Sequence, residues 1–470
     1  MDAITPLQHR NTPPSRWHDW RDLMQLAWPM LIGQVAQVGM GVADTVMAGA
    51  VSPLDLGAVA VGFSLWLPIY VLCIGVLSAV TATIARAVGA ADAMRQTRAF
   101  QQGLWLAFGL ALIAIAIVAH ADALLPLMQV DAAVQPLGKR YLQGIAFGIP
   151  PIMLFQVLRA LSEGNGKSKP VMIIQVIAFL INIPLNYMFI HGAFIYGDWG
   201  IPKLGGAGCG WATGCVMWLQ FIFLAWLLRK QWRKLLRKQD GLSRAPQWQW
   251  LWPLIKLGAP IGGAMFTETS VFAGAALLIG RLGAETLAAH QIALNYSALM
   301  FMVPMSLGQA LTVKIGHMLG AQNPQRARRF AMLGATTSIL FALCSAAIML
   351  NIPYAIASAY TSDEVVRLLT VQILFYSAMF QLFDGLQVTA IGSLRGYHDT
   401  RAAMFVTIVA YWFVGLPLGY TLGLTDIFGT ARGVFGIWIG LVAGLAVAAL
   451  LLNWRLRNIS HNAIAPTANA

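Results

Sequence analysis

The amino-acid sequence predicts an all-α integral membrane protein, with twelve transmembrane helices in two six-helix lobes related by pseudo-two-fold symmetry along the membrane normal. Three observations support this prediction. The chain is 58% hydrophobic and only 10% charged, and its mean hydropathy of +0.68 lies outside the usual range of soluble domains. Its basic residues fall between apolar runs. Its two halves also repeat each other.

Twelve apolar runs are each long enough to cross a bilayer, which takes about 20 residues. Prolines inside these runs, such as Pro29 and Pro260, are interpreted as bends or helix starts. We expect the helices to begin near Leu23, Leu56, Ala99, Tyr141, Val171, Leu204, Pro253, Thr286, Phe330, Leu368, Ala402 and Gly433.

The basic residues indicate how the chain is oriented, because cytoplasmic loops carry an excess of Lys and Arg. We therefore expect a multi-pass protein of the bacterial inner membrane with both termini cytoplasmic. The formal net charge of +13 does not indicate nucleic-acid binding, since the basic residues are not interleaved with aromatics along one helix face. In this orientation the outer loops hold, of 31 Lys and Arg, only Lys139, Arg140, Lys203, Arg281, Arg367 and Arg432.

These patterns divide the chain into five expected segments. Residues 1–21 form a polar cytoplasmic tail that lacks the apolar core and cleavage site of a secretory signal. The first lobe spans 22–228 and the second spans 251–457, and a basic cytoplasmic linker (229–250) joins them. Residues 458–470 form a second cytoplasmic tail. The charge run of the linker is interpreted as a solvated segment beside anionic lipid headgroups.

An internal repeat relates the two lobes. The motif "LAWP" ending at Pro29 matches "LGAP" ending at Pro260, a displacement of 231 residues, and the same displacement pairs Arg95 with Arg326. Each half has an even number of helices, so both halves enter the membrane from the same side. Their symmetry axis then runs along the membrane normal, and a ligand path is expected at their interface.

Three carboxylates lie inside apolar runs: Asp44, Glu268 and Asp384. A charged side chain at the bilayer centre costs about 2.5–3.5 kcal/mol on insertion scales. The repeat places Ala275 opposite Asp44 and Gln37 opposite Glu268, so the duplicated scaffold does not require these acids. We infer that protons, metal cations or cationic ligands neutralise them, which indicates a transporter.

Asp44 follows a polar stripe on the first helix. Gln34, Gln37, Gly41 and Asp44 share one helix face by their spacing. The stripe favours a water-lined cavity beneath the acid. The alternative is a carboxylate that is exposed to solvent at the end of the helix and has no further role.

The two other acids are expected near the middle of their helices. Glu268 stands in the motif "FTETS", where hydroxyls and a carboxylate together suit a hard cation. Asp384 lies in a stripe with Gln381 and Gln387. The alternatives are a protonated, hydrogen-bonded Glu268 and a structural interhelical hydrogen bond from Asp384. Arg159, near an inner helix end, is a candidate gate residue.

The remaining chemistry of the sequence excludes most enzymes. There is no reactive His/Asp cluster or metal-ligand set at a membrane interface, so we predict that the chain is not an enzyme. The cysteines fit neither a zinc site nor a disulfide framework and are read as packing residues. They are Cys73, Cys209, Cys215 and Cys344.

Four longer motifs resemble the NorM branch of the MATE (multidrug and toxic compound extrusion) family, and the likeness runs over essentially the whole chain. The resemblance implies twelve helices in two lobes and export of organic cations by antiport against sodium or protons. The motifs are "QVAQVGMGVADTVMAG" (34–49), "NIPLNYMFIHG" (182–192), "GIPKLGGAGCGWATG" (200–214) and "FDGLQVTAIGSLRGYHDT" (383–400).

The resemblance also implies roles for single residues. Asp44 is the first-lobe carboxylate, and Glu268 and Asp384 form the second-lobe cation site, a site for H⁺ or Na⁺. Some members carry a tyrosine one turn before the tenth-helix Asp, where this chain has Phe380; the lost oxygen favours protons. The substrate cavity is expected to include Gln34, Gln37, Asn182, Gln291, Gln387 and Phe380.

The sequence hypothesis is therefore a cation-coupled multidrug antiporter that works by alternating access, in which drug and coupling ion compete for the carboxylates. Expected partners are lipophilic cationic drugs and dyes and the lipid bilayer, with no nucleic acid and no cofactor beyond the coupling ion. The protein is expected to act as a monomer. The alternatives are a lipid-linked precursor flippase, which should carry cations in its central cavity, and a passive channel.

Overall fold

The computed structural model describes residues 15–127, 130–196, 199–237, 245–427 and 429–464. Within them, twelve helices are long and apolar enough to cross a membrane. This confirms the predicted fold class and helix number. In the first lobe these helices are α1 (Arg16–Gly49), α2 (Pro53–Gly89), α3 (Ala93–Ala119), α5 (Gln135–Gly164), α6 (Lys169–His191) and α7 (Ala207–Leu227).

The second lobe repeats this order. Its eleventh span is not a uniform α-helix, because α14 (Thr400–Ile408) passes through a π-helical segment, η2 (Val409–Gly415), into α15 (Leu416–Leu424). The other second-lobe spans are α9 (Trp248–Gly280), α10 (Ala284–Gly320), α11 (Pro324–Asn351), α13 (Glu364–Tyr397) and α16 (Val434–Asn462).

Several short elements were not expected from the sequence. They are too short or too polar to cross a bilayer, so a search for apolar runs passes over them. They comprise η1 (Ala121–Ala123), α4 (Leu124–Leu127), the antiparallel pair β1 (Ala193–Tyr196) and β2 (Trp199–Ile201), α8 (Arg229–Arg237) and α12 (Pro353–Ser358).

The repeat found in the sequence extends to the backbone of the helix connections. Asp92 caps α3 by accepting a hydrogen bond from the Arg95 amide at 2.8 Å, and Asn323 caps α11 through the Arg326 amide at 3.0 Å. These caps stand 231 residues apart. The residues before them, at 91 and 322, both have φ of 54°. Two turns with the same unusual geometry at matched positions are expected of a duplicated fold.

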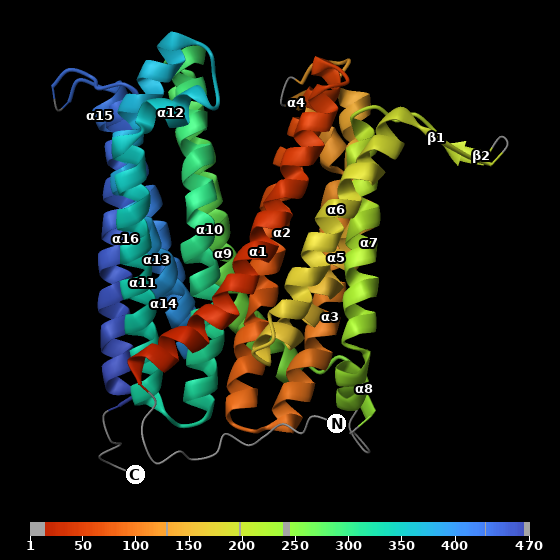
Figure 1. Cartoon of the computed structure of the whole chain (residues 1–470), viewed down its shortest axis with the longest axis vertical. Helices are drawn as coiled ribbons and strands as arrows, with labels where there is room; N and C mark the ends of the chain where they lie inside the picture. The colour runs from red at the N-terminus through yellow and green to blue at the C-terminus, as the bar shows by residue number, and fades with distance from the viewer. Residues whose placement is uncertain (1–14, 128–129, 197–198, 238–244, 428, 465–470) are drawn as a thin grey trace.

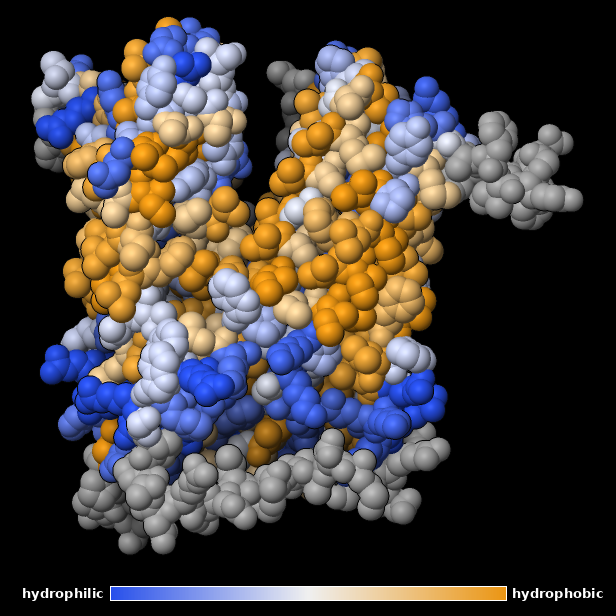
Figure 2. All heavy atoms as spheres, viewed as in Figure 1, coloured by the Kyte–Doolittle hydropathy of each residue, from blue (hydrophilic) through white to orange (hydrophobic). Residues whose placement is uncertain are grey.

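The two lobes separate at one end of the molecule and meet at the other. We call the end where α1 begins and α16 ends the closed end, and the opposite end the open end. Figure 2 shows a cleft between the lobes at the open end, and Figure 1 shows the two helix groups diverging around it. At the closed end a Cβ on Gly89 would lie 2.1 Å from the backbone oxygen of His317, so α2 and α10 can approach closely only because Gly89 is glycine.

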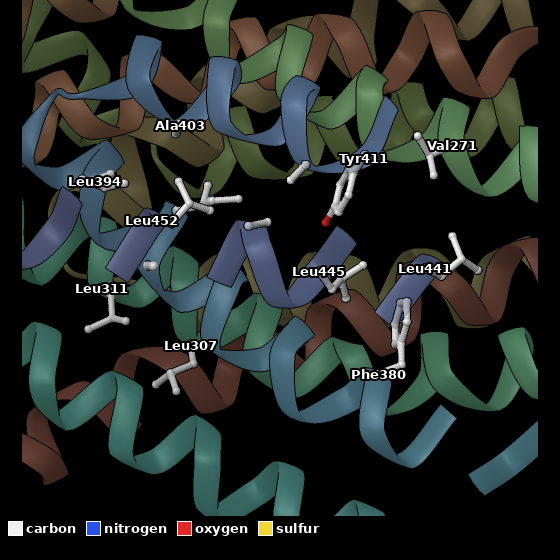
Figure 3. Close-up of a cluster of buried hydrophobic side chains, with 14 of the residues drawn as sticks. Val271, Leu307, Leu311, Phe380, Leu394, Ala403, Tyr411, Leu441, Leu445 and Leu452 are labelled. Carbon is white, nitrogen blue, oxygen red and sulfur yellow. The ribbon is translucent and has the colours of Figure 1, made fainter. Parts of the chain in front are cut away.

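Each lobe has its own apolar core, and a second apolar surface faces outward. Trp438 on α16 is fully buried in the second-lobe core, where Leu311, Tyr411 and Leu445 also lie (Figure 3). Leu277 remains 77% exposed, and Figure 2 shows apolar residues over much of the outer face between the two ends. An apolar exterior around an apolar core is what a lipid environment permits.

Candidate functional site

The first-lobe carboxylate, Asp44 on α1, lies among hydrogen-bond donors. Asn186 donates to its Oδ1 at 2.6 Å, Asn182 to the same oxygen at 3.3 Å, and Thr213 to its Oδ2 at 2.8 Å. Asp44 is only 6% exposed, which argues against a carboxylate that is simply wet at a helix mouth. The donors replace the water lost on burial, so Asp44 is compensated by neutral groups.

The partners of Asp44 come from two other helices of the same lobe. Asn182 and Asn186 stand one turn apart on α6, and Asn186 also donates to the Oδ1 of Asn182 at 3.1 Å. Thr213 comes from α7. This helix can pack closely on α6 because Gly208 has no side chain, whereas a Cβ there would lie 2.6 Å from a backbone atom of α6. The sequence identified Asn182 only; the spacing of the two asparagines was the signal for Asn186.

The second-lobe carboxylates share one small cavity. Glu268 on α9 and Asp384 on α13 both line a cavity of about 240 Å³, together with Asn295 and Ser297 on α10. Among the described residues, neither acid has a side-chain hydrogen bond or an ion pair. Aromatic rings complete the wall: Phe272, Phe301 and Phe380.

The hydroxyls beside Glu268 do not surround it as the sequence suggested. Thr267, Thr269 and Ser270 donate to carbonyl oxygens of their own helix at 2.7–2.9 Å. The Ser297 hydroxyl is also engaged, with Ala293 and with Ser377. Hydroxyl groups in apolar helices satisfy themselves on the preceding turn, so proximity in sequence does not make them ligands.

Phe380 and Gln387 lie deeper in the second lobe. The Phe380 ring contacts the rings of Phe272 and Trp438, each with centroids 5.9 Å away. Gln387 is fully buried and accepts a hydrogen bond from the Tyr411 hydroxyl at 2.5 Å. Figure 3 shows Phe380 and Tyr411 among the aliphatic side chains of the core. Phe380 therefore borders the carboxylate cavity, whereas Gln387 braces the π-helical segment.

A larger cavity of about 390 Å³, which we call the central cavity, lies between the lobes. Gln34 and Gln37 of the predicted stripe line it from α1, and Gln309 lines it from α10. Arg395 on α13 also lines it. The wall thus combines amide groups with methionine and other apolar side chains contributed by both lobes. Gln291, by contrast, is exposed on α10 and lines neither this cavity nor the carboxylate cavity.

Arg159 links the lobes at the floor of the central cavity. It donates to Glu163 on its own helix at 2.7 Å and to Gln309 of the other lobe at 2.9 Å. The Nε2 of His317 lies 2.7 Å from the Gly164 carbonyl oxygen, which makes a second link between α10 and α5. The polar contacts and the glycine contacts together hold this end closed.

The three membrane carboxylates differ from the acids at the closed end, which pair with arginines. None of them forms an ion pair with a Lys or Arg in the described part of the chain. In the same residues, no group of three or more His, Cys, Asp or Glu side chains is placed to hold a metal ion. Any cation bound here would depend on two carboxylates and neutral oxygens.

Comparison with known proteins supplies the family. The family model of MatE matches residues 29–188 and again residues 260–421, which is most of the chain. The chain belongs to the MatE family. The two matches begin 231 residues apart, so the MATE fold itself contains the repeat that the sequence displays.

Relatives of the chain within this MATE family are similar over nearly their whole length. The multidrug resistance protein PmpM of Pseudomonas aeruginosa is 45% identical, with 93% of this chain and 91% of the relative covered. The multidrug resistance protein NorM of Vibrio vulnificus is 40% identical, with coverage of 93% and 94%. The predicted resemblance is confirmed.

Solved MATE structures share the fold at much lower sequence identity. The outward-facing conformation of a multidrug resistance MATE family transporter superposes with a TM-score of 0.85 and 20% identity, covering 95% of this chain and 97% of that one. A eukaryotic MATE transporter, AtDTX14, gives a TM-score of 0.83 at 19% identity, covering 95% and 98%. At such identities the likeness concerns the fold alone.

Proposed function

We propose that this protein exports lipophilic organic cations as a multidrug antiporter, driven by a cation that loads Glu268 and Asp384. The observation that carries the proposal is this acidic pair, which lines a cavity between membrane-spanning helices and receives no hydrogen bond from the described residues. Charges held in an apolar site need a partner. Relatives at 40–45% identity are named multidrug resistance proteins, which supports drugs as the cargo.

The proposed orientation places the closed end in the cytoplasm of a bacterial inner membrane. Basic side chains support it, since Arg95, Arg326 and Arg455 all stand at this end, near helix starts or ends. Figure 2 shows a hydrophilic band there. The excess of positive charge is the usual mark of the cytoplasmic side. The cleft at the open end would then face outward.

The coupling device is competition for negative charge. A cation from outside loads Glu268 and Asp384 and neutralises them, which releases the drug through the open cleft. When the closed end opens, the cation leaves and the ionised pair attracts the next drug. A ligand shifts such an equilibrium only through its different affinity for the two states. One charge moving across ~100 mV supplies about 2.3 kcal/mol.

The wall of the cavity favours protons over sodium as the coupling ion. A hard cation prefers a shell of several oxygen ligands. Here, among the described residues, only Asn295 and Ser297 add side-chain oxygens to those of the two carboxylates in the cavity wall, and Phe380 offers none. The hydroxyls next to Glu268 in sequence do not line the cavity. A proton needs no such shell.

One observation supports a second candidate, a lipid-linked precursor flippase. Arg395 lines the central cavity and no ion pair with a described residue neutralises it, so an anionic headgroup could meet it there. Against this, Arg159 in the same wall is already paired with Glu163. The carboxylate cavity also repels phosphate.

The deciding experiment is ethidium efflux measured in everted membrane vesicles that carry the full chain. A pH gradient and a sodium gradient are imposed in turn, with vesicles lacking the protein as control. We expect the pH gradient to drive transport and the sodium gradient to have little effect. If neither gradient moves ethidium, antiport is rejected, and transfer of a fluorescent lipid-linked phosphate across liposomes then tests the flippase.

A further inference from the structure

Two junctions at the closed end are related by the internal repeat. In the first, the start of α1 meets the start of α11; in the second, the start of α9 meets the start of α3. Each junction therefore joins one lobe to the other. The displacement of 231 pairs Arg95 with Arg326 and Arg98 with Arg329. Equivalent pairs of arginines thus lie at the two junctions, each at the start of a helix.

Carboxylates neutralise the first junction. Asp19 on α1 is fully buried, and its Oδ1 lies 2.7 Å from Nη2 and 2.9 Å from Nε of Arg326. Its Oδ2 lies 3.1 Å from Nη1 of Arg329. Asp22 adds a second acid, 3.7 Å from Arg326. This is a forked, charge-assisted contact, which is among the stronger kinds of ion pair.

The second junction lacks both of these acids. The repeat places Trp250 at the position of Asp19 and Pro253 at the position of Asp22. The guanidinium of Arg98 lies 6.0 Å from the centroid of the Trp250 ring, the residue that the repeat places at the position of Asp19. The repeat thus carries the arginines in both halves, whereas Asp19 and Asp22 have no acidic counterpart in the second junction.

A large cavity occupies the place where the acids are missing. It measures about 760 Å³ and is lined from both lobes by Arg95 and Arg98 of α3, Lys256 of α9 and Arg401 of α14. Asp92 also lines it, but its Oδ1 already accepts from the Arg95 amide as the helix cap. In the described part of the chain no ion pair engages the side chain of Arg95, Lys256 or Arg401.

His398 lines the same cavity without adding to its charge. It lies in the turn between α13 and α14. Burial, with further help from the nearby Arg86, lowers the pKa of His398 to about 4, so the ring is neutral at ordinary pH. The positive charge of the cavity therefore comes from its arginine and lysine side chains.

We propose that this cavity binds the phosphate headgroup of an anionic phospholipid, which supplies the negative charge that Asp19 supplies in the first junction. Basic pockets between transmembrane helices commonly hold such headgroups. Trp248 and Trp252 flank the site on α9, stacked 5.4 Å apart and 65% and 49% exposed. Exposed tryptophans of this kind mark the headgroup level of a bilayer, which favours a lipid over a soluble anion.

The bound lipid would join the lobes. Arg95 and Arg98 belong to the first lobe, whereas Lys256 and Arg401 belong to the second. A phosphate held by both sets stabilises the closed junction, as Asp19 does on the other side. The proposal depends on the membrane setting of the fold and not on the drug or the coupling ion, so it can fail while the proposed transport holds.

The test is native mass spectrometry of the purified full chain, titrated with phosphatidylglycerol and separately with phosphatidylcholine. The first variant, Arg95→Gln with Lys256→Gln and Arg401→Gln, removes three cavity charges. A matched control, Lys230→Gln with Arg233→Gln and Lys234→Gln, removes three charges from the basic helix α8. Each basic group near a membrane surface contributes about a fivefold gain in affinity, so we expect roughly 100-fold weaker phosphatidylglycerol binding in the cavity variant and a clearly smaller loss in the α8 control, whose charges do not line the cavity.

A second variant tests the symmetry argument directly. Trp250→Asp places a carboxylate where the other junction has Asp19, and it should weaken phosphatidylglycerol binding about tenfold or more while thermal stability in phosphatidylcholine nanodiscs is kept. Wild-type phosphatidylglycerol affinity in the folded cavity variant would overturn the proposal. So would an equal loss in the α8 control, because the effect would then be one of net charge.

A final arm separates a lipid from a soluble anion. Inorganic phosphate and glycerol 3-phosphate are added to the phosphatidylglycerol-bound protein at increasing concentration. We expect them to displace the lipid only at high concentration, because they lack the acyl chains and the tryptophan contacts. If inorganic phosphate alone protects the protein from thermal unfolding and phosphatidylglycerol does not, the lipid assignment is wrong.

Discussion

The two lobes hold their membrane carboxylates in opposite ways. Asp44 in the first lobe receives hydrogen bonds from Asn182, Asn186 and Thr213. Glu268 and Asp384 in the second lobe receive none from the described residues and share a cavity with aromatic walls. Fixed donors stabilise the charge of a buried carboxylate, whereas a pair that receives no hydrogen bond from the described residues is suited to take up and release a cation. The difference supports the proposal that the coupling ion loads in the second lobe and that the first lobe holds a fixed charge.

The largest effect is expected from neutralising the second-lobe pair. Glu268→Gln and Asp384→Asn should each reduce gradient-driven ethidium efflux to the level of empty vesicles, because each removes one of the two charges for which ion and drug compete. Vesicle efflux and membrane expression are measured together. Glu285→Gln, an exposed carboxylate of the same lobe, serves as the control and should transport normally. Transport at the wild-type rate in either cavity variant removes that residue from the coupling.

Neutralising the first-lobe acid should cost less. Asp44→Asn keeps the size of the side chain and can keep most hydrogen bonds, so the fold is preserved and only the charge is lost. We expect the drug resistance of cells that express the variant to fall. The protein should still bind and release protons. Complete loss of proton exchange would show that Asp44 loads the ion, and the contrast between the lobes would then collapse.

Removing a donor tests the first-lobe site from its other side. Asn186→Ala deletes the shortest hydrogen bond to Asp44, and bonds to charged groups contribute about 1.5–3 kcal/mol. We expect roughly tenfold lower resistance and a lower unfolding temperature. Asn351→Ala, which loses only a bond to its own helix, should leave both unchanged. Equal effects of the two would mean that the donors around Asp44 are dispensable.

The smallest change should alter ion preference and not the rate. Phe380→Tyr adds one hydroxyl beside Glu268 and Asp384, in a wall with few free oxygens. We expect the rate of sodium-driven ethidium efflux to be a few-fold higher in the variant than in the wild type. The rate of pH-driven efflux should stay similar. The vesicle assay with imposed gradients measures both. An unchanged sodium response would remove the oxygen count as the reason for proton preference.

The sequence identified those site residues that can be recognised without knowledge of their contacts. It identified the three acids, since any carboxylate in an apolar run stands out. It also placed Gln34 and Gln37 on one face, and both line the central cavity. It expected hydroxyls around Glu268, which the structure instead shows bonded to their own helix. The hydrogen bonding of a hydroxyl depends on local competition that the spacing of residues does not reveal.

The twelve spans and the duplication could be predicted from the amino-acid sequence alone. Hydropathy is a local sum over about 20 residues, and a repeat is read by comparing positions, so neither requires knowledge of contacts. The contacts of Asn186 and Thr213 with Asp44 became apparent from the folded chain, because more than a hundred positions separate these residues from Asp44 in the sequence. The tertiary structure alone decided that the lobes part at one end. Those outcomes depend on the rotation and tilt of each helix against its neighbours, which packing fixes and composition does not.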